Sequence, residues 1–385
     1  MKIAMVSVHG GPLAEASGPQ EDTPVAGLSA ALARQGHEVT VYHRRDRPDA
    51  PERVRTARGV EVVLVPAGPL EPLADEHVLP HIGDFTAFLL RDWASSAPDV
   101  VHGHRWMSGM VSVLGGRRAG VPVVQTFHSL AAAEQRDCPA EAVPDERRRI
   151  EVLVGREAAH VTAGSAGEAF ELARTGVKRT KISVVPGGVD VAAFTPEGPR
   201  APRDRPFRVV TPLHRRHTGA VVTALARIDG AELVVSGLPA QGDPVVEKLR
   251  EHGRQAGAKV VFTRSVTPEL LRSADAVVCA SSYEPSGALA LEAMACGVPV
   301  VASAVDALAD VVVDGVTGLL VPAGEQEGLA RALRSLLLND TLRDEFSVAG
   351  HDRVMARYSW DHVAADFLRV YERAGAATGT PIVAR

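Results

Sequence analysis

Short apolar runs rich in β-branched residues alternate along the chain with longer segments of helical periodicity. In the first half, the runs predicted as strands are 3–7, 38–42, 61–65, 100–103, 123–127, 160–162 and 182–185. In the second half, they are 208–211, 232–236, 259–262, 276–279, 299–302 and 318–321. Because strands that alternate with helices are typical of parallel βα units, we expect an α/β protein with doubly wound sheets.

The segments between these runs carry apolar residues at helical spacing. The predicted helices are 25–34, 85–95, 106–117, 146–158, 166–174, 220–227, 244–254, 268–273 and 287–296. The last part of the chain is predicted to be mainly helical, over 327–338, 342–357 and 360–373. Glycine or proline follows several of these segments, as Gly36 follows the first, and such residues commonly end a helix.

A proline-rich segment separates the two halves. Residues 196–206 contain four prolines and one glycine, a composition typical of linkers. We therefore predict a first domain over 1–195, a linker over 196–206 and a second domain over 207–358, with a terminal helix and tail over 359–385. Two doubly wound domains joined in this way would face a central cleft at the carboxyl ends of both sheets, where ligands bind in such folds.

Composition narrows the range of functions. The 385 residues are 45% hydrophobic and 23% charged, as in soluble globular proteins, and the net charge of −5 argues against a broad surface for nucleic acid. No apolar run reaches membrane length, and the first residues enter a strand rather than a signal peptide. The cysteines (Cys138, Cys279 and Cys296) have no metal-binding or disulfide spacing, which favours a cytoplasmic protein in which Cys279 and Cys296 are core residues.

The most informative segment is 283–302, where two carboxylates lie eight residues apart. Ser286-Gly287 predicts a helix start and Gly297 a left-handed helix stop, which places Glu284 just before the helix and Glu292 inside it. A helix N-terminus binds anions such as a diphosphate, and a buried carboxylate needs donors such as sugar hydroxyls. The alternative is an ordinary helix with one surface glutamate and one partly buried glutamate.

This segment resembles the E-x7-E motif of the family-four glycosyltransferases, retaining enzymes that have the GT-B fold and use nucleotide-sugar donors. The resemblance implies two Rossmann-like domains and a C-terminal helix that crosses back to the first domain, here near Trp360. It also implies that Glu284 contacts the donor sugar and that Glu292 holds the ribose hydroxyls. The backbone that follows Glu284 is expected to contribute to the donor site through Ser286, Gly287, Ala288 and Leu289.

The N-terminal loop resembles that of the mycothiol-pathway and sucrose-phosphate-synthase branch of this family. A strand runs into Gly10 and Gly11, and the resemblance implies that these glycines let the backbone approach the donor phosphates. Further on, Thr23-Pro24 stands where relatives commonly carry two glycines. Proline removes a backbone donor and stiffens the turn, so we expect a weakened or altered grip on the diphosphate from this loop.

The strand end around residue 104 also resembles that branch. His102 and His104 alternate there, and we expect one of them to face the cleft and the other the interior. We favour His104 as an acceptor-binding residue, with a core histidine as the alternative. Arg105 replaces an aromatic residue common in relatives, which indicates a changed acceptor.

His128 matches a family histidine near the donor sugar, and the alternative is a capping or core histidine. Relatives with phosphorylated acceptors carry Lys or Arg shortly afterwards, whereas residues 131–134 are Ala-Ala-Ala-Glu here. This exchange favours a neutral or amine-bearing acceptor. Asp22 and Glu134 are candidates to line its pocket, together with Glu15, Glu21 and Asp137, although solvated loop charges explain most of them better.

A basic loop follows the first strand of the second half. By resemblance, Arg216 aligns with the phosphate-binding Lys of the family. The family's phosphate-binding Arg is missing, Thr211 is the residue nearest to its position, and we expect Arg215 to compensate for it. Guanidinium groups hold a diphosphate through two oxygens and would neutralise the leaving group, although a solvated basic loop is the alternative. Because the chain has no Asp-x-Asp motif, we expect neither a metal nor another cofactor.

Two further loops depart from the family pattern. The family recognises the nucleotide base near Val266, but Arg264 replaces a glycine there. The identity of the base is therefore left open, with uracil as the default. Asp306-Ala307 occupies the usual Gly-Gly position beside the sugar.

These observations predict a metal-independent retaining hexosyltransferase with Glu284, Arg216 and His128 as catalytic residues. We expect a UDP-sugar donor (glucose or N-acetylglucosamine) and a small non-phosphorylated acceptor, such as the aminocyclitol 2-deoxystreptamine of antibiotic biosynthesis. The alternatives are a glycosyltransferase of lipid or polysaccharide assembly, a nucleotide-sugar epimerase of the same fold and a non-catalytic sugar-nucleotide-binding protein. The oligomeric state stays open, a homodimer included.

Overall fold

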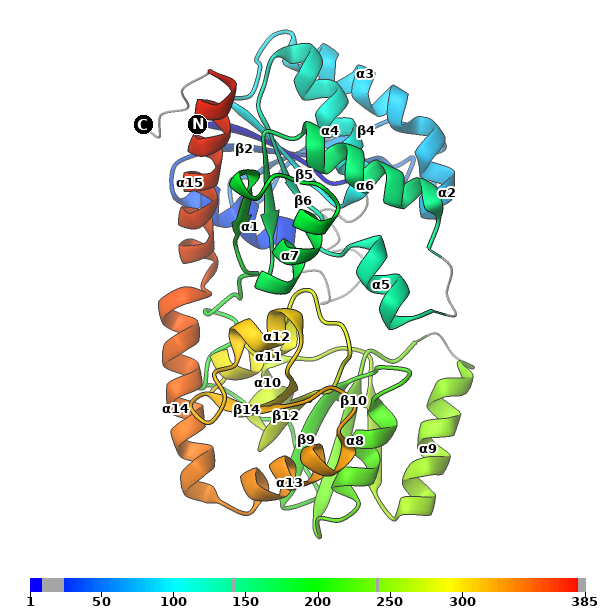
Figure 1. Cartoon of the computed structure of the whole chain (residues 1–385), viewed down its shortest axis with the longest axis vertical. Coiled ribbons are helices and arrows are strands. Elements are labelled where there is room, and N and C mark those ends of the chain that lie inside the picture. Colours follow the sequence, from blue (N-terminus) through cyan, green and yellow to red (C-terminus); the bar gives the residue numbers. More distant parts are fainter. Residues whose placement is uncertain (9–23, 140–142, 240–241, 380–385) are drawn as a thin grey trace. The chain divides into compact units, whose positions relative to one another are not determined.

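The computed structural model describes residues 1–8, 24–139, 143–239 and 242–379 (Figure 1). The chain forms two compact units. Unit 1 comprises Met1–Pro186 together with Trp360–Arg385, and unit 2 comprises Gly187–Ser359. The prediction of an α/β chain with two doubly wound units is confirmed. The proline-rich segment 196–206 lies inside unit 2, and the domain boundaries drawn from composition stay a prediction.

Unit 1 is built on one mainly parallel sheet. Its strands are β1 (Lys2–Val6), β2 (Glu38–Arg44), β3 (Arg53–Arg55), β4 (Glu61–Val65), β5 (Val100–His104), β6 (Val123–Thr126), β7 (His160–Ala163) and β8 (Ile182–Val184). Over the described residues their order is β3-β4-β2-β1-β5-β6-β7-β8, and β3 pairs antiparallel with β4. The strand order reverses between β1 and β5, and loops that leave parallel strands at such a point diverge and leave room for a ligand.

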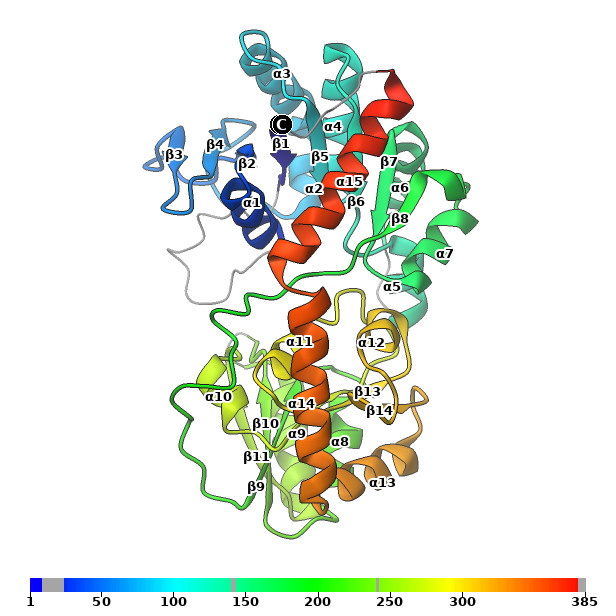
Figure 2. The ribbon, with the colours of Figure 1, turned by 90° about the vertical axis from the view of Figure 1, so that its left-hand side faces the viewer.

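Helices cover both faces of this sheet. They are α1 (Pro24–Arg34), α2 (Asp75–Val78), α3 (Ile82–Trp93), α4 (Trp106–Ala119), α5 (Ala131–Asp137), α6 (Asp145–Glu157), α7 (Ala166–Arg174) and α15 (Trp360–Thr378). Helices α1 and α15 pack together on one face, in a core that joins Leu28 and Tyr371 to Met5 of β1. Figure 2 shows α15, in red, crossing that face beside α1. The chain's last helix therefore completes the core of unit 1, as the resemblance implies.

Close packing of α15 depends on a missing side chain at Gly27. A Cβ atom built at Gly27 would overlap the indole ring of Trp360, which is only 8% exposed. Trp360 therefore packs as an anchor between α15 and α1. Its neighbour Asp361 adds a surface ion pair with Arg34, at 2.7 Å.

We expect Gly27→Ala to destabilise unit 1 by about 1–3 kcal/mol, because overpacking of a dense core forces side chains and backbone to shift. Gly83→Ala in α3 is the matched control, since no atom lies within 4 Å of its added Cβ. The control should raise stability slightly, because alanine is the better helix former by about 1 kcal/mol. Thermal unfolding of both variants checks this contrast, and equal shifts would show that the helix contact does not depend on Gly27.

Unit 2 has a fully parallel sheet over its described residues. The strands are β9 (Phe207–Pro212), β10 (Ala231–Ser236), β11 (Lys259–Thr263), β12 (Ala276–Cys279), β13 (Val300–Ser303) and β14 (Gly318–Val321). Their order is β11-β10-β9-β12-β13-β14, so the reversal falls between β9 and β12. The helices are α8 (Thr218–Leu225), α9 (Pro244–Ala256), α10 (Pro268–Arg272), α11 (Ala288–Ala295), α12 (Asp306–Val311), α13 (Gln326–Leu337) and α14 (Asp340–Arg357).

Two hydrophobic clusters sandwich this sheet. One contains Leu291, Met294 and Val354 under α11 and α14, and the other contains Leu225 and Leu333 under α8 and α13. Central strands such as β12 are buried on both faces, which explains why they read as continuous apolar runs. The thiols of Cys279 and Cys296 are buried, which confirms their prediction as core residues.

A few elements differ from the prediction. Strand β3 and helices α2, α5 and α12 are short, with three to seven residues, and α3 begins at Ile82 rather than at residue 85. Elements of this length leave too little periodicity to be recognised. Across the described ranges, no helix has the length and hydrophobicity that crossing a membrane requires.

Candidate functional site

The turn that leads into α11 is held by Glu284, the residue predicted to meet the donor sugar. One carboxylate oxygen of Glu284 accepts the backbone N–H groups of Ser286 and Gly287, both at 3.2 Å, and the Ser286 hydroxyl at 2.9 Å. Gly287 has a φ of 63° and Gly297 beyond the helix a φ of 69°. The predicted start and stop of this helix are thus confirmed. The N–H groups of Ser286 and Gly287, expected to bind a diphosphate, are hydrogen-bonded to the carboxylate of Glu284 in this structure.

A second loop holds the backbone of Glu284 in place. The N–H of Glu284 donates to the Asp306 carboxylate at 3.2 Å, and the Ala307 N–H donates to the Glu284 carbonyl at 3.1 Å. Asp306 adopts a φ of 38°, which is costly for a residue with a side chain. Asp306-Ala307, a departure from the family pattern, therefore fixes the loop that carries Glu284.

Glu284 and Glu292 both lie close to Cys279, at the end of β12. Burial raises the pKa of the Cys279 thiol, and the negative charges of Glu284 and Glu292 raise it further. Glu292 is half-buried on α11, and Leu289 packs partly buried against the core below. Because ionised carboxylates accept hydrogen bonds and donate none, this pair of side chains is suited to bind a ligand rich in hydroxyl groups.

The basic turn after β9 separates its three side chains. The Arg215 guanidinium makes an ion pair with Asp243, the N-cap of α9, at 2.6 Å. Arg216 is exposed. His217 is half-buried, and its Nε2 lies 2.9 Å from the Ser282 hydroxyl. A hydrogen bond between His217 and Ser282 joins the β9 and β12 loops at the reversal of strand order.

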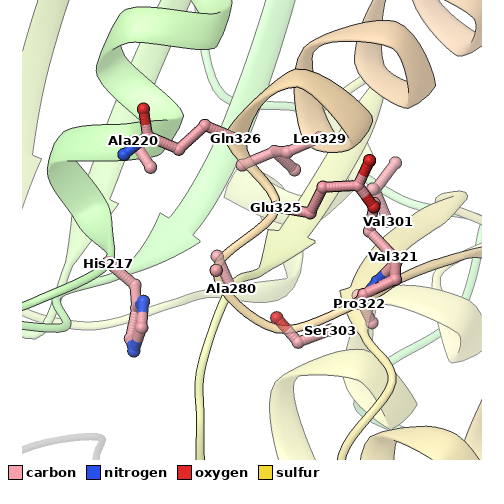
Figure 3. Close-up of a pocket in the computed structure, with 12 residues that line it drawn as sticks. His217, Ala220, Ala280, Val301, Ser303, Val321, Pro322, Glu325, Gln326 and Leu329 are labelled. Atoms are coloured by element: carbon pink, nitrogen blue, oxygen red, sulfur yellow. The ribbon is translucent and has the colours of Figure 1, made fainter.

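His217 is a candidate that sequence reasoning missed. It lines a hollow above the carboxyl ends of β12, β13 and β14, with Ala280 and Ser303 among the other lining residues (Figure 3). The available signal was its place as the last residue before α8, where a side chain reaches the switch point of the sheet. An imidazole there can donate a hydrogen bond to a phosphate oxygen.

Val266 lies in the loop between β11 and α10. Its side chain is half-buried and packs against the core under α11. The preceding loop is closed by a hydrogen bond from the Thr263 hydroxyl to the Ser265 carbonyl, at 3.2 Å. The role of Val266 in base recognition stays a prediction.

In unit 1, three histidines gather at the ends of β5 and β6. His102 bonds to the Tyr371 hydroxyl of α15 at 2.9 Å and to the Thr126 hydroxyl at 2.8 Å. His104 Nδ1 lies 3.0 Å from His128 Nε2, and those two rings are stacked. The prediction that His102 and His104 face opposite ways is wrong, because residues two apart on a strand share one face; their ring centres are 4.0 Å apart.

This histidine cluster is neutral at physiological pH. Burial lowers the pKa of His102 to about 3 and that of His128 to about 4. The pKa of His104 is also lowered, by burial first, then by the repulsion it would meet from protonated His102 or His128, and by the charge of Arg105. The Nε2 atom of His104 is buried and has no hydrogen-bond partner among the residues described. Neutral imidazoles can both donate to and accept from sugar hydroxyls.

These lowered pKa values predict an acid-sensitive fold. Below pH 6.5 the histidines of the unfolded chain bind protons, whereas the buried histidines of the folded state stay neutral. The free energy of unfolding should therefore fall as pH falls. The slope is up to about 1.4 kcal/mol per pH unit for each histidine. Chemical denaturation between pH 6.5 and 5 measures it. His128→Asn, which tolerates the φ of 64° at this position, should flatten the slope, and an unchanged slope would contradict burial as its cause.

Arg105 and His128 both have left-handed backbones. Their φ angles are 69° and 64°; Arg105 directly follows β5, and His128 lies two residues after the end of β6. Such conformations cost on the order of 1–3 kcal/mol for residues with side chains and concentrate at functional sites. Arg105 is exposed, and its charge acts on His104 and His128. His104, Arg105 and His128 thus lie together at one end of the sheet.

Glu134 lies in the first turn of α5 and is engaged by Arg147 of α6. The Arg147 guanidinium donates to both Glu134 oxygens, at 2.7 and 3.0 Å. The hydrogen bonds from Arg147 hold the pKa of Glu134 below its usual range despite burial. Sequence reasoning treated Glu134 as a pocket-lining acid but missed this partner, which lies thirteen residues further along the chain.

The remaining predicted residues, Gly10, Gly11 and Asp22, lie outside the described residues, as do Glu15, Glu21 and Thr23. Their proposed contacts with donor phosphates and acceptor stay predictions.

Two family models match the chain. The glycosyl transferase 4-like domain matches residues 22–188, and the glycosyl transferases group 1 domain matches residues 218–353. Together they cover most of both units.

Similar proteins match along nearly the whole length. The chain is 34% identical to a D-inositol 3-phosphate glycosyltransferase from Xylanimonas cellulosilytica and 35% identical to one from Actinosynnema mirum, in each case over 97% of both chains. A solved sucrose-phosphate synthase from Thermosynechococcus elongatus has 28% identity and a TM-score of 0.84, over 98% of this chain and 99% of that one. With its two Rossmann-like units and its matches to both family models, this chain belongs to the family-four glycosyltransferases of GT-B fold.

Proposed function

We propose that this glycosyltransferase moves a hexosyl group, glucose or N-acetylglucosamine, from a UDP-sugar to a hydroxyl of a small non-phosphorylated acceptor. We further propose that it does so with retention of configuration, without a metal and in the cytoplasm. The observation that carries the proposal is the Glu284 carboxylate over the N-terminus of α11, with Glu292 on the same helix. Carboxylates and backbone N–H groups in one place can bind the hydroxyls and the diphosphate of a single ligand.

Binding of the nucleotide sugar would replace the hydrogen bonds between Glu284 and the N–H groups at the start of α11. When Glu284 turns to the hydroxyls of the sugar, the N–H groups of Ser286 and Gly287 become available to the diphosphate. These N–H groups and the positive end of the helix dipole stabilise negative charge on the leaving group. Arg216, which is exposed in the turn after β9, and the imidazole of His217 would add positive charge or hydrogen-bond donors there.

Retention would follow from departure and attack on one face of the sugar. The bond from the anomeric carbon to the phosphate oxygen breaks, and a bond from that carbon to the acceptor oxygen forms. The acceptor's proton passes to the departing phosphate, so the products are UDP and the glycosylated acceptor. Glu134 is held by Arg147 and is therefore unsuited to act as a nucleophile, which supports a mechanism without a covalent intermediate.

The acceptor is expected to carry hydroxyls without phosphate. The similar proteins are named for a phosphorylated cyclitol, D-inositol 3-phosphate, which makes a cyclitol ring the natural starting point. Residues 131–134 lack the cation expected for a phosphate, and the Glu134 carboxylate lies there instead. An aminocyclitol such as 2-deoxystreptamine, and with it a role in antibiotic biosynthesis, remains the narrower prediction; the names of the similar proteins do not point to it.

A donor-by-acceptor panel read by mass spectrometry tests the proposal. It pairs UDP-glucose, UDP-N-acetylglucosamine and their GDP and ADP counterparts with myo-inositol, D-inositol 3-phosphate and 2-deoxystreptamine. We expect a hexosylated neutral or amine-bearing cyclitol with a UDP-sugar and an axial anomeric bond by NMR. Exclusive transfer to D-inositol 3-phosphate would refute the acceptor. An isomerised donor without acceptor would indicate an epimerase, and binding without turnover would indicate a non-catalytic protein.

A further inference from the structure

The guanidinium of Arg147 is engaged on all sides by its own protein. Nε donates to Glu151 at 2.8 Å, Nη1 donates to Glu134 at 2.7 Å, and Nη2 donates to Glu134 at 3.0 Å and to the Ser129 hydroxyl at 3.1 Å. The Arg147 side chain is only 15% exposed. A buried arginine fork of this kind matches the geometry of a phosphate or carboxylate, and Glu134 fills it.

The two carboxylates hold Arg147 from different sides. Glu151 has 8% of its side chain exposed and also accepts the Ala131 N–H at 3.0 Å, so it anchors the arginine from the interior. Glu134 has 33% exposed and forms the outer partner. Removing Glu134 would therefore free one N–H of each terminal nitrogen, while Glu151 and Ser129 kept the guanidinium in place.

This ion pair lies beside the predicted acceptor residues. Ser129 directly follows His128 in the chain, and the positive field of Arg105 reaches both His128 and Glu134. Because the histidines are neutral, the charges of Arg105 and Arg147 are balanced by those of Glu134 and Glu151. The next arginine of α6, Arg148, is turned to Gln135 at 3.3 Å.

We propose that Glu134 selects acceptors by their charge. Its carboxylate occupies the Arg147 fork and thereby excludes phosphorylated acceptors. The inference rests on the proposed function for the presence of the acceptor at this end of unit 1. It goes further by naming Glu134 as the residue responsible for the selectivity and the Arg147 guanidinium as a phosphate-binding fork that Glu134 covers. The Glu134 carboxylate does not weaken the binding of neutral or amine-bearing acceptors. A phosphate group must either displace this carboxylate from Arg147 or be repelled by its negative charge.

The decisive variant is Glu134→Ala, which opens the fork without adding a side chain to α5. We expect the ratio of kcat/KM for D-inositol 3-phosphate to that for myo-inositol to rise tenfold or more. Glu157→Gln, an exposed acid on α6, is the matched control and should leave the ratio unchanged. A wild type that prefers the phosphorylated cyclitol, or an unchanged ratio in Glu134→Ala, would overturn the inference.

A binding measurement separates this inference from the proposed function. Inorganic phosphate is titrated calorimetrically into protein saturated with UDP, so that the donor site is filled. Glu134→Ala should gain a phosphate site that the wild type lacks, and the double variant with Arg147→Met should lose it again. If no cyclitol is glycosylated but this site appears, the proposed function fails and the fork stands. If transfer occurs but no site appears, the fork fails alone.

Discussion

Replacing Glu284 by alanine should lower kcat/KM for the UDP-sugar by about 10²–10³-fold, the loss typical of a removed group that stabilises the transition state. Glu284 accepts the N–H groups of Ser286 and Gly287, and its own N–H donates to Asp306. In the proposed donor complex it would also bind the sugar, so its loss should disturb both donor orientation and these N–H groups. Steady-state kinetics with saturating acceptor measure the effect.

A matched pair of variants separates charge from structure at this position. Glu284→Gln keeps an oxygen that can accept the N–H bonds of the helix end, so it should retain the wild-type melting temperature while still losing most activity. Glu345→Gln, an exposed acid on α14, should have neither effect. Near-normal turnover in Glu284→Gln would mean that the residue serves only to hold the turn before α11.

Arg216→Ala should reduce kcat by about 10–100-fold, because a charge-assisted hydrogen bond to the leaving phosphate is worth about 1.5–3 kcal/mol. Arg215→Ala should cost much less, since its guanidinium is engaged with Asp243 at 2.6 Å. Kinetics of both variants with one UDP-sugar make the comparison. A larger loss in Arg215→Ala would show that donor binding breaks the ion pair and recruits Arg215 instead.

Much of the fold could be predicted because its signals are local. The strand that ends at His104 is marked by an apolar run, and α11 is marked by its apolar residues and by Gly297 just beyond its end. Short elements such as α5 escaped prediction, since seven residues starting with three alanines show no periodicity. The composition of 196–206 marks a loop well, yet contacts between distant residues, and not composition, decide to which unit such a segment belongs.

The candidate site could be predicted only as separate pieces. The motif around Glu284 identifies its helix, but the capping bonds and the support from Asp306 depend on how two loops meet at the sheet. The same is true of the Glu134–Arg147 pair, whose partners lie on different helices. His102 and His104 show the opposite case, because the period of a strand was sufficient to place both on one face.

A crystal structure of the protein soaked with UDP tests the donor site most directly. We expect the ribose hydroxyls to bond to the Glu292 carboxylate and the diphosphate to lie against the N–H groups at the start of α11, with Glu284 turned away from them. UDP bound elsewhere, or Glu284 still accepting the N–H groups of Ser286 and Gly287 beside bound UDP, would contradict the donor site on which the proposed transfer depends.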